Sequence, residues 1–299
     1  MTTLTRYARL VDAQVCTGVT VRAVRATPRG FEIHAHDGIR YARALVLATG
    51  ACSLPAIPAV AGAVLRSVST LTPLTYRDPG QLPDGGVLVV GASASGVQLA
   101  AEIRRSGRPV TLSAGEHVPS GHVTCRLPSS RVRLVSRSPT STGRPGRRPP
   151  RRIRDGVAQF SGSLPSTCAL ADLKMNRFLK RTDEWATAQG LGDELPPPHR
   201  FAATQIDPAT PLELDLATGE ITTVLWATGF RPDYSWLDIA PCDRTGHIRH
   251  HGGVVTGVPG LYVLGLPVVR TRASTYIHGA VADTDVLAGH LGAFLSQRQ

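Results

Sequence analysis

One segment of 29 residues constrains the fold more than any other part of the chain. It reads GGVLVVGASASGVQLAAEIRRSGRPVTLS and runs from Gly85 to Ser113. A valine-rich apolar run leads into a glycine turn, then into a stretch of helical periodicity, and then into a second short apolar run. This order of elements, strand, turn, helix and strand, within about 30 residues is typical of a βαβ unit. The two strands of such a unit lie parallel in one sheet. The segment therefore predicts an α/β fold.

The turn of this segment is GASASG, and it fits the dinucleotide fingerprint except at the middle glycine, where Ser93 stands. Gly91 permits the tight turn after the strand, and Gly96 lets the helix pack closely on the sheet. The helix N-terminus offers unpaired N–H groups to a diphosphate, with the hydroxyls of Ser93 and Ser95 as further donors. We therefore expect a dinucleotide to bind at Gly91, Ser93, Ala94, Ser95 and Gly96. The alternative is a glycine-tolerant helix start in an ordinary α/β sheet.

The end of the second strand bears on the kind of dinucleotide. An acidic residue about 20 positions beyond the first glycine usually holds the ribose of NAD, but Leu112 and Ser113 occupy that place. Arg108 and His117 are nearby cations. The pattern favours NADP over NAD, with Ser113 at the cofactor.

Three further apolar runs resemble buried strands that end in small residues. They are ALVLATG at 44–50, ITTVLWATG at 221–229 and GLYVLGLP at 260–267. Small residues at a strand end let the backbone approach a cofactor closely. Outside these runs, alternation predicts strands at 19–26 and 31–36, followed by a hairpin turn at Asp37 and Gly38.

Apolar spacing predicts which helix positions pack inward. In the helix after the glycine turn, the positions expected to face the sheet are Val97, Ala100, Ala101 and Ile103. Helices are also predicted near 169–189 and 280–295. The first of these has amphipathic spacing, carried by Leu170, Leu173, Phe178, Leu179 and Trp185.

Together these motifs resemble the flavin-containing monooxygenases and related flavoprotein oxidoreductases with two dinucleotide-binding domains. The resemblance is carried by the GxSxSG turn between two strands ending in ATG, the second continuing as ATGFRPDYSW, and by PGLYVLGLP. It implies FAD and NADP as cofactors, hydride passing from NADPH to flavin, and a small-molecule substrate. It places the cofactors near Ala48, Thr49 and Gly50, and near Ala227, Thr228 and Gly229. No side chain is singled out as catalytic.

The resemblance also implies a domain organisation. A Rossmann-like NAD(P)-binding domain at 83–225 is expected to be inserted into an incomplete FAD-type domain made of 1–82 and 226–299. The family's own FAD phosphate motif precedes the first ATG, and residues 1–47 contain no such motif. The monooxygenase pattern FxGxxxHxxxY is likewise not present in full, so oxygen insertion is less secure than oxidoreduction.

The net charge of +11 lies mainly in one tract. Residues 126–154 hold ten arginines and no acidic residue, whereas the whole chain has 33 Lys and Arg against 22 Asp and Glu. Because its Pro, Gly, Ser and Arg content cannot build a core, we expect the tract to be disordered. Arginine far outnumbers lysine in the chain, which indicates GC-rich coding DNA. A frameshift or deletion that leaves a nucleotide-binding remnant without turnover is therefore an alternative.

Several other classes of function are less well supported. The arginine tract could bind nucleic acid through phosphates, but it has no aromatic residue for stacking, so we expect no specific nucleic-acid partner. Two groups of histidines, His34 with His36 and the set at 247, 250 and 251, lack the neighbouring carboxylates and cysteines that usually complete a metal site. We therefore expect no metal. The five cysteines are scattered and are expected to be reduced thiols. With no membrane-spanning run and no secretory signal, we expect a cytoplasmic protein without a membrane partner. The oligomeric state stays open.

Overall fold

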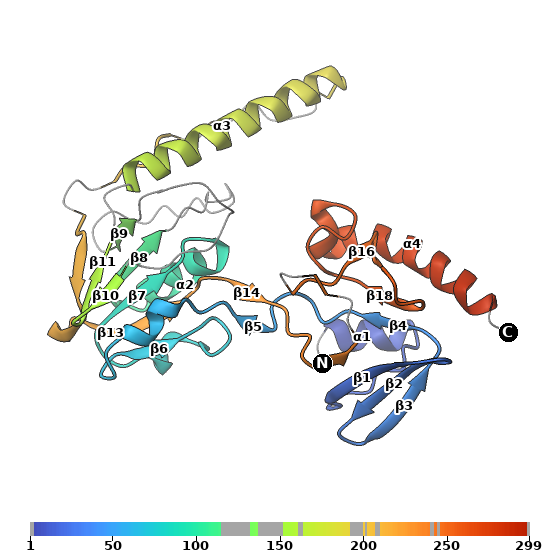
Figure 1. The fold of residues 1–299 in the computed structure, drawn as a ribbon. Coiled ribbons are helices and arrows are strands. Elements are labelled where there is room, and N and C mark those ends of the chain that lie inside the picture. The colour runs from blue at the N-terminus through green and yellow to red at the C-terminus, as the bar shows by residue number, and fades with distance from the viewer. Residues whose placement is uncertain are drawn as a thin grey trace. The chain divides into compact units, whose positions relative to one another are not determined.

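The computed structural model describes residues 3–114, 132–136, 152–160, 164–191, 200, 202–206, 210–239, 242–243 and 246–297. The chain forms two compact units (Figure 1). The first is made of Met1–Leu54 and Arg231–Gln299, and the second is Pro55–Phe230. The second unit is therefore inserted between the two segments of the first. The α/β class expected from the sequence is confirmed.

The second unit is built around a five-stranded sheet with the order β6-β13-β7-β8-β9. Every pairing in this sheet is parallel. Its strands are β6 (Ser69–Leu71), β7 (Gly86–Val90), β8 (Val110–Ala114), β9 (Val132–Ser136) and β13 (Ile221–Trp226). Helix α2 (Ala94–Arg105) connects β7 to β8, so the predicted βαβ unit is present with its two strands adjacent.

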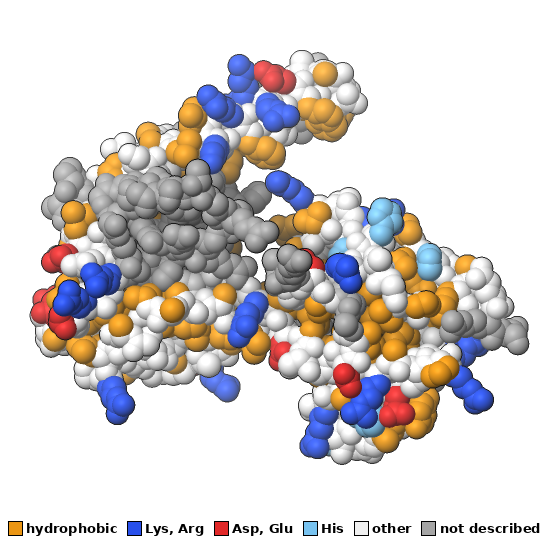
Figure 2. All heavy atoms as spheres, viewed as in Figure 1, with side chains coloured by type: hydrophobic (Ala, Val, Ile, Leu, Met, Phe, Trp, Pro, Cys, Tyr) orange, Lys and Arg blue, Asp and Glu red, His pale blue; other side chains and the backbone are white. Residues whose placement is uncertain are grey.

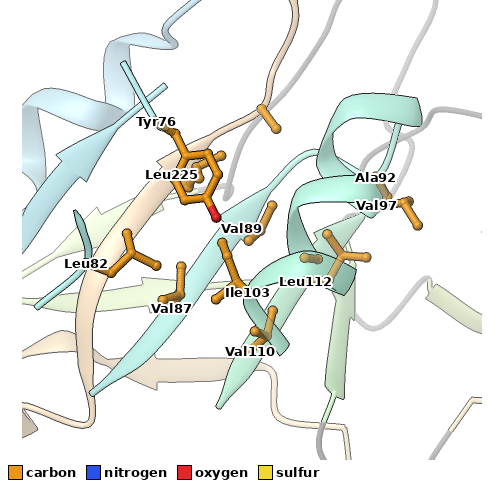
Figure 3. Packing of buried hydrophobic residues seen from close by; sticks show 12 residues of the cluster. Tyr76, Leu82, Val87, Val89, Ala92, Val97, Ile103, Val110, Leu112 and Leu225 are labelled. Atoms are coloured by element: carbon orange, nitrogen blue, oxygen red, sulfur yellow. The ribbon is translucent and has the colours of Figure 1, made fainter. Parts of the chain in front are cut away.

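Both faces of this sheet are buried, as parallel strands require. Val87 and Val89 point to the face that α2 covers, where they meet Ile103 (Figure 3). The helix buries Val97, Ala100, Ala101 and Ile103 as predicted. The alternate residues of β7, Leu88 and Val90, belong to a second cluster on the opposite face.

An antiparallel three-stranded sheet supplies the cover of that second face, and the sequence did not predict it. Its order is β10-β11-β12, from β10 (Arg152–Arg154), β11 (Val157–Gln159) and β12 (Glu213–Asp215). Ile153, Ala158 and Phe160 pack there against Leu88 and Val90. The rest of the second unit comprises η1 (Ala59–Ala63), η2 (Pro79–Gln81), η3 (Leu216–Thr218) and α3 (Leu164–Ala188).

The expected disorder of the arginine tract is wrong for two of its stretches. Residues 132–136 form β9, which pairs with β8 in register from Val110 to Ala114. Residues 152–154 form β10, where Ile153 is buried between two arginines. Alternation of an apolar residue with arginine suits strand β10, because the side chains of Arg152 and Arg154 are exposed on the face opposite Ile153. Residues 126–131 and 137–151 lie outside the described residues.

The first unit contains two four-stranded sheets, with orders β15-β1-β2-β3 and β16-β17-β18-β4. The first sheet holds the two predicted antiparallel strands, β1 (Val21–Thr27) and β2 (Gly30–Ala35). Strand β3 (Gly38–Ala42), which was not predicted, pairs antiparallel with β2, and β15 (Leu237–Asp238) pairs in parallel with β1. The second holds β4 (Leu45–Leu47), β16 (His250–His251), β17 (Val254–Val255) and β18 (Leu261–Val263). The helical elements are α1 (Thr3–Leu10), η4 (Arg272–Thr275) and α4 (Ile277–Ser296).

The hairpin between β2 and β3 turns at Asp37 and Gly38, as expected. Arg40 donates two hydrogen bonds of 2.8 Å to the Asp37 carboxylate. This bidentate contact lowers the pKa of Asp37 to about 2.

Strand β4 differs from the buried strand expected at 44–50. It is shorter, and it lies at the edge of its sheet, with β18 as its partner. Leu47 is buried, whereas Val46 on the other face is 41% exposed.

The unit boundaries at 54/55 and 230/231 differ from the segment boundaries expected at 82/83 and 225/226. Residues 55–82 join the second unit because β6 pairs with β13 and η1 packs on the face opposite α2. The two places where the chain passes between the units form the short strands β5 (Leu54–Pro55) and β14 (Phe230–Arg231), which pair with each other.

Truncation of Ile103 tests the packing of α2 on the sheet. Ile103 is completely buried, so Ile103→Ala is expected to lower the free energy of unfolding by about 2–5 kcal/mol. Gln98 lies on the exposed side of the same helix, and Gln98→Ala is expected to change it by about 0.5 kcal/mol or less. Urea unfolding of both variants measures the difference. Equal midpoints would show that α2 does not pack on the sheet as described.

Candidate functional site

The turn between β7 and α2 is shaped by two glycines that have no room for a side chain. Gly91 has φ +111°, and a Cβ there would lie 2.4 Å from the carbonyl oxygen of Ala227. A Cβ at Gly96 would lie 1.8 Å from the carbonyl oxygen of Gly91. Both contacts are far inside van der Waals distance. The roles expected for these two glycines follow directly from the backbone geometry.

The N-terminus of α2 leaves backbone donors free. Ser93 is the N-cap residue and its side chain makes no capping hydrogen bond. The first bond of the helix runs from the Val97 N–H to the Ser93 carbonyl, at 3.0 Å. Among the described residues, the N–H groups of Ala94, Ser95 and Gly96 therefore have no acceptor. Free donors at the positive end of a helix dipole are suited to bind an anion.

The second ATG turn lies directly against this site. It follows β13, the parallel neighbour of β7. The Ala227 side chain lies 3.3 Å from the position that a Gly96 Cβ would take. Thr228 Oγ1 donates to the Ala56 carbonyl at 2.7 Å, and the Gly229 carbonyl accepts from the Ala56 N–H at 2.8 Å. The turn is thus held in place by the chain segment that follows β5.

Ser113 lies at the carboxyl end of β8, next to the glycine turn. Its carbonyl accepts a hydrogen bond of 2.9 Å from the Gly91 N–H, and the residue is buried. The structure therefore brings Ser113, the turn at 91–96 and the turn at 227–229 together at the carboxyl ends of three neighbouring parallel strands. In open α/β sheets, that edge is where ligands bind.

Arg108 lies away from this edge, contrary to its expected place near the cofactor. It precedes β8, and its guanidinium donates to the carbonyls of Leu82, at 2.7 Å, and Pro83, at 2.5 Å. Asp84 lies 3.7 Å from the same group. Sequence proximity was misleading because the two ends of a strand lie on opposite edges of the sheet. His117, the other cation considered, lies outside the described residues.

The first ATG turn belongs to the other unit, and the structure does not place it with the second one. It follows β4, and Gly50 has φ +71°, a conformation that favours glycine. Ala48 and Thr49 are exposed, and Gly50 is half-buried. This turn also lies at the carboxyl end of a parallel strand pair, β4 with β18.

Asp283 is a buried polar residue that the sequence analysis missed. It lies in α4, is 1% exposed, and its Oδ2 has no hydrogen-bond partner among the described residues. Burying a carboxylate oxygen without a partner costs free energy, so such atoms often mark a ligand or water position. The available signal was a pair of acidic residues, Asp283 and Asp285, within a largely apolar helix.

The histidines considered as metal ligands have other contacts. His34 Nε2 contacts Glu32 Oε1, and His36 Nδ1 accepts from the Thr20 N–H at 3.1 Å. Burial lowers the pKa of His250, with a smaller contribution from His251. Across the ranges that the structure describes, no three His, Cys, Asp or Glu residues gather as a metal site would require. The cysteines at 16, 52, 168 and 242 are free thiols, and Cys125 lies outside the described residues.

Comparison with known proteins relates this chain to oxidoreductases. Residues 2–132 match the family model described as pyridine nucleotide-disulphide oxidoreductase. An uncharacterized oxidoreductase of Geobacillus kaustophilus, described as CzcO-like, is 27% identical over 94% of this chain and 74% of its own length. The oxidoreductase CzcO of Bacillus subtilis, also described as uncharacterized, is 26% identical over 81% of this chain and 63% of its own length.

Solved structures share the fold at low sequence identity. A flavin-containing monooxygenase from Stenotrophomonas maltophilia has a TM-score of 0.60, with 20% identity over 97% of this chain and 74% of that one. A thioredoxin reductase from Lactococcus lactis has a TM-score of 0.51, with 16% identity over 93% and 75%. The resemblance predicted from the motifs is confirmed: this chain is similar in sequence to uncharacterized oxidoreductases described as CzcO-like, matches the pyridine nucleotide-disulphide oxidoreductase model over residues 2–132, and has the fold of the flavin-containing monooxygenases.

Proposed function

We propose that this chain is a flavin-dependent oxidoreductase that takes reducing equivalents from a nicotinamide dinucleotide. The observation that carries the proposal is the free donor set at the start of α2, framed by two glycines that admit no side chain. In this proposal the diphosphate accepts hydrogen bonds from the N–H groups of Ala94, Ser95 and Gly96. Glycine at 91 and 96 and alanine at 227 keep the backbone close enough for that contact.

The residues of the second unit bind and orient; they carry no covalent step. Thr228 fixes the turn beside the helix start through its bond to Ala56. Ser93 and Ser95 offer hydroxyls next to the free amides. When bound, the dinucleotide supplies a hydride and the flavin accepts it, which is chemistry that belongs to the cofactors. The protein then has to hold the nicotinamide ring and the flavin ring in the right positions for hydride transfer.

FAD is the flavin that the resemblance favours, and the first unit is its expected place. The turn at 48–50 leaves its backbone accessible after β4, and Asp283 supplies a buried acceptor without a partner. These features suit a polar ligand held by the first unit. The small-molecule substrate, the absence of a specific nucleic-acid partner and a cytoplasmic location stay predictions.

NADP is the dinucleotide that we propose, on narrower grounds than the sequence analysis used. Residues 110–114 include no carboxylate that would repel a 2′-phosphate. Arg108 no longer supports the choice, because its guanidinium is bound to two backbone carbonyls.

A remnant that binds nucleotide without turnover is the second candidate. The observation in its favour is the open edge of β4, where Val46 is exposed and Ala48 and Thr49 have little cover. A flavin site built on such an edge would lack one wall.

Charge at the α2 N-terminus tests the diphosphate site. Ser95→Glu places a carboxylate beside the free amides, which the helix dipole tolerates or favours. The variant is expected to weaken NADPH binding at least about tenfold, because its carboxylate would occupy the anion position and repel the diphosphate. Ser95→Gln has the same shape but no charge, and its NADPH affinity is expected to stay within about threefold of the original. Fluorescence titration of NADPH gives the affinities, and thermal melting checks that both variants fold. Unchanged binding in Ser95→Glu would remove the site from the proposal.

Arg108→Ala separates stability from cofactor choice. Because Arg108 binds the carbonyls of Leu82 and Pro83, its loss is expected to lower the free energy of unfolding by about 1–3 kcal/mol. The ratio of NADPH to NADH affinity is expected to stay constant. The control is Arg105→Ala, at an exposed position near the end of α2. A ratio that falls several-fold in Arg108→Ala alone would place this guanidinium at the 2′-phosphate after all.

Flavin content distinguishes the enzyme from the remnant. Protein purified and then incubated with FAD is expected to retain a yellow colour with an absorbance band at roughly 450 nm. The band is expected to bleach on anaerobic addition of NADPH. A colourless protein that binds NADPH but does not oxidise it would support the remnant instead.

A further inference from the structure

Helix α3 exposes an apolar face that the second unit does not use. Its buried residues are Leu164, Cys168, Ala171 and Ala186. The larger apolar side chains, which the spacing had suggested as the packing side of an amphipathic helix, are exposed instead. The exposed fractions are 51% for Leu170, 46% for Leu173, 64% for Phe178 and 59% for Trp185. Apolar groups of this size on one helix face are typical of an interaction surface.

Three cations share that face. Lys174, Arg177 and Arg181 are exposed, and the structure gives them no ion-pair partner among the described residues. With the four apolar residues they occupy positions i, i+3, i+4, i+7, i+8, i+11 and i+15, which fall on one side of a helix. We call this set the α3 outer face: Leu170, Leu173, Lys174, Arg177, Phe178, Arg181 and Trp185. Figure 2 shows hydrophobic and basic side chains side by side along this helix.

The acidic residues of α3 are already engaged, which leaves the outer face basic. Asp172 accepts from the backbone and the hydroxyl of Thr204, at 2.7 Å and 2.9 Å. Asp183 pairs with Arg200 at 2.6 Å, and Glu184 lies 3.8 Å from Lys180. Asp172 and Asp183 are thus engaged away from the outer face. Glu184 falls within that face, at i+14 from Leu170, where Lys180 and the three cations outnumber it. A binding partner therefore meets positive charge.

We propose that the α3 outer face docks on the surface of an anionic lipid bilayer, in place of the sequence-based expectation that the protein has no membrane partner. Leu170, Phe178 and Trp185 would enter the boundary between headgroups and acyl chains, where the amphipathic indole ring is favoured. Lys174, Arg177 and Arg181 have long apolar stems, so their charged ends can reach lipid phosphates while the stems lie against the apolar layer. The helix lies in the surface plane. Among the described residues, no helix is long and apolar enough to span a membrane, and surface docking does not need one.

Two other occupants fit the face less well. A second copy of the same face would bring three unpaired cations against three more, and like charges across an interface are unfavourable. Nucleic acid would satisfy the cations and could stack on Phe178 and Trp185, but it offers no apolar layer for Leu170 and Leu173. An anionic bilayer satisfies the charged and the aliphatic groups together.

The full-length protein and vesicles of defined composition test this. Binding is measured by co-sedimentation with vesicles of phosphatidylcholine alone or with added phosphatidylglycerol, and by Trp185 emission. Trp226 is 1% exposed, and Trp185→Phe identifies the part of the signal that comes from Trp185. We expect at least about tenfold tighter binding to the anionic vesicles, weakened by salt, and a blue shift of the Trp185 emission.

Matched variants separate the α3 outer face from the arginines at 126–154. Leu170→Ser with Phe178→Ser leaves every arginine in place and alters exposed positions only, so folding is expected to be unaffected. It should weaken vesicle binding at least about tenfold. Lys174→Gln with Arg177→Gln and Arg181→Gln should remove the preference for anionic lipid. Arg66→Gln, at an exposed position outside α3, is the control.

Several results would overturn the proposal. One is vesicle binding that the Leu170→Ser and Phe178→Ser variant leaves unchanged, because the arginine tract alone would then account for it. Others are a Trp185 emission that does not respond to anionic vesicles, or one that shifts without lipid as protein concentration rises, which would indicate a second copy. A Trp185 emission that shifts on addition of DNA or RNA but not on addition of vesicles would assign the face to nucleic acid.

Discussion

The structure of the second unit depends on one steric constraint: three backbone segments meet at the carboxyl end of its sheet with no space for side chains. Gly91 faces the Ala227 carbonyl, and Gly96 faces the Gly91 carbonyl, both at distances that no Cβ could share. This close approach sets the direction in which α2 leaves β7, and with it the position of the free N–H groups. The geometry of the candidate dinucleotide site is therefore a consequence of packing within the second unit.

Burial on both faces of the parallel sheet explains how the rest of that unit is arranged. Alternate residues of β7 serve opposite faces, one covered by α2 and the other by a small antiparallel sheet. The sheets of the first unit are less completely buried. Its strand β4 has one neighbour, and the buried residues of its helix α4 are Asp283 and Leu287 alone. The open edge is the reason that a remnant without turnover stays a candidate beside the enzyme.

The positive charges of this chain serve different purposes according to what surrounds them. Arg108 is bound to two carbonyls and acts in packing. Arg40 holds a hairpin carboxylate. Among the residues that the structure describes, the cations of the α3 outer face have no such partners, and they are the ones that we propose to contact anionic lipid. A net charge read from composition cannot distinguish these cases, because the distinction rests on which acceptors lie within hydrogen-bond distance.

The sequence by itself determined the features that depend on neighbouring residues. The βαβ unit, the buried positions of α2, the two glycine roles and the turn at Asp37 and Gly38 follow from local periodicity and from backbone conformation, and all are present. Tertiary structure decided what depends on distant partners. It placed residues 55–82 in the second unit through the pairing of β6 with β13, made strands of two stretches of the arginine tract, and turned Arg108 away from the site. It also exposed Phe178 and Trp185, because helical spacing defines an apolar face but does not say whether anything covers it.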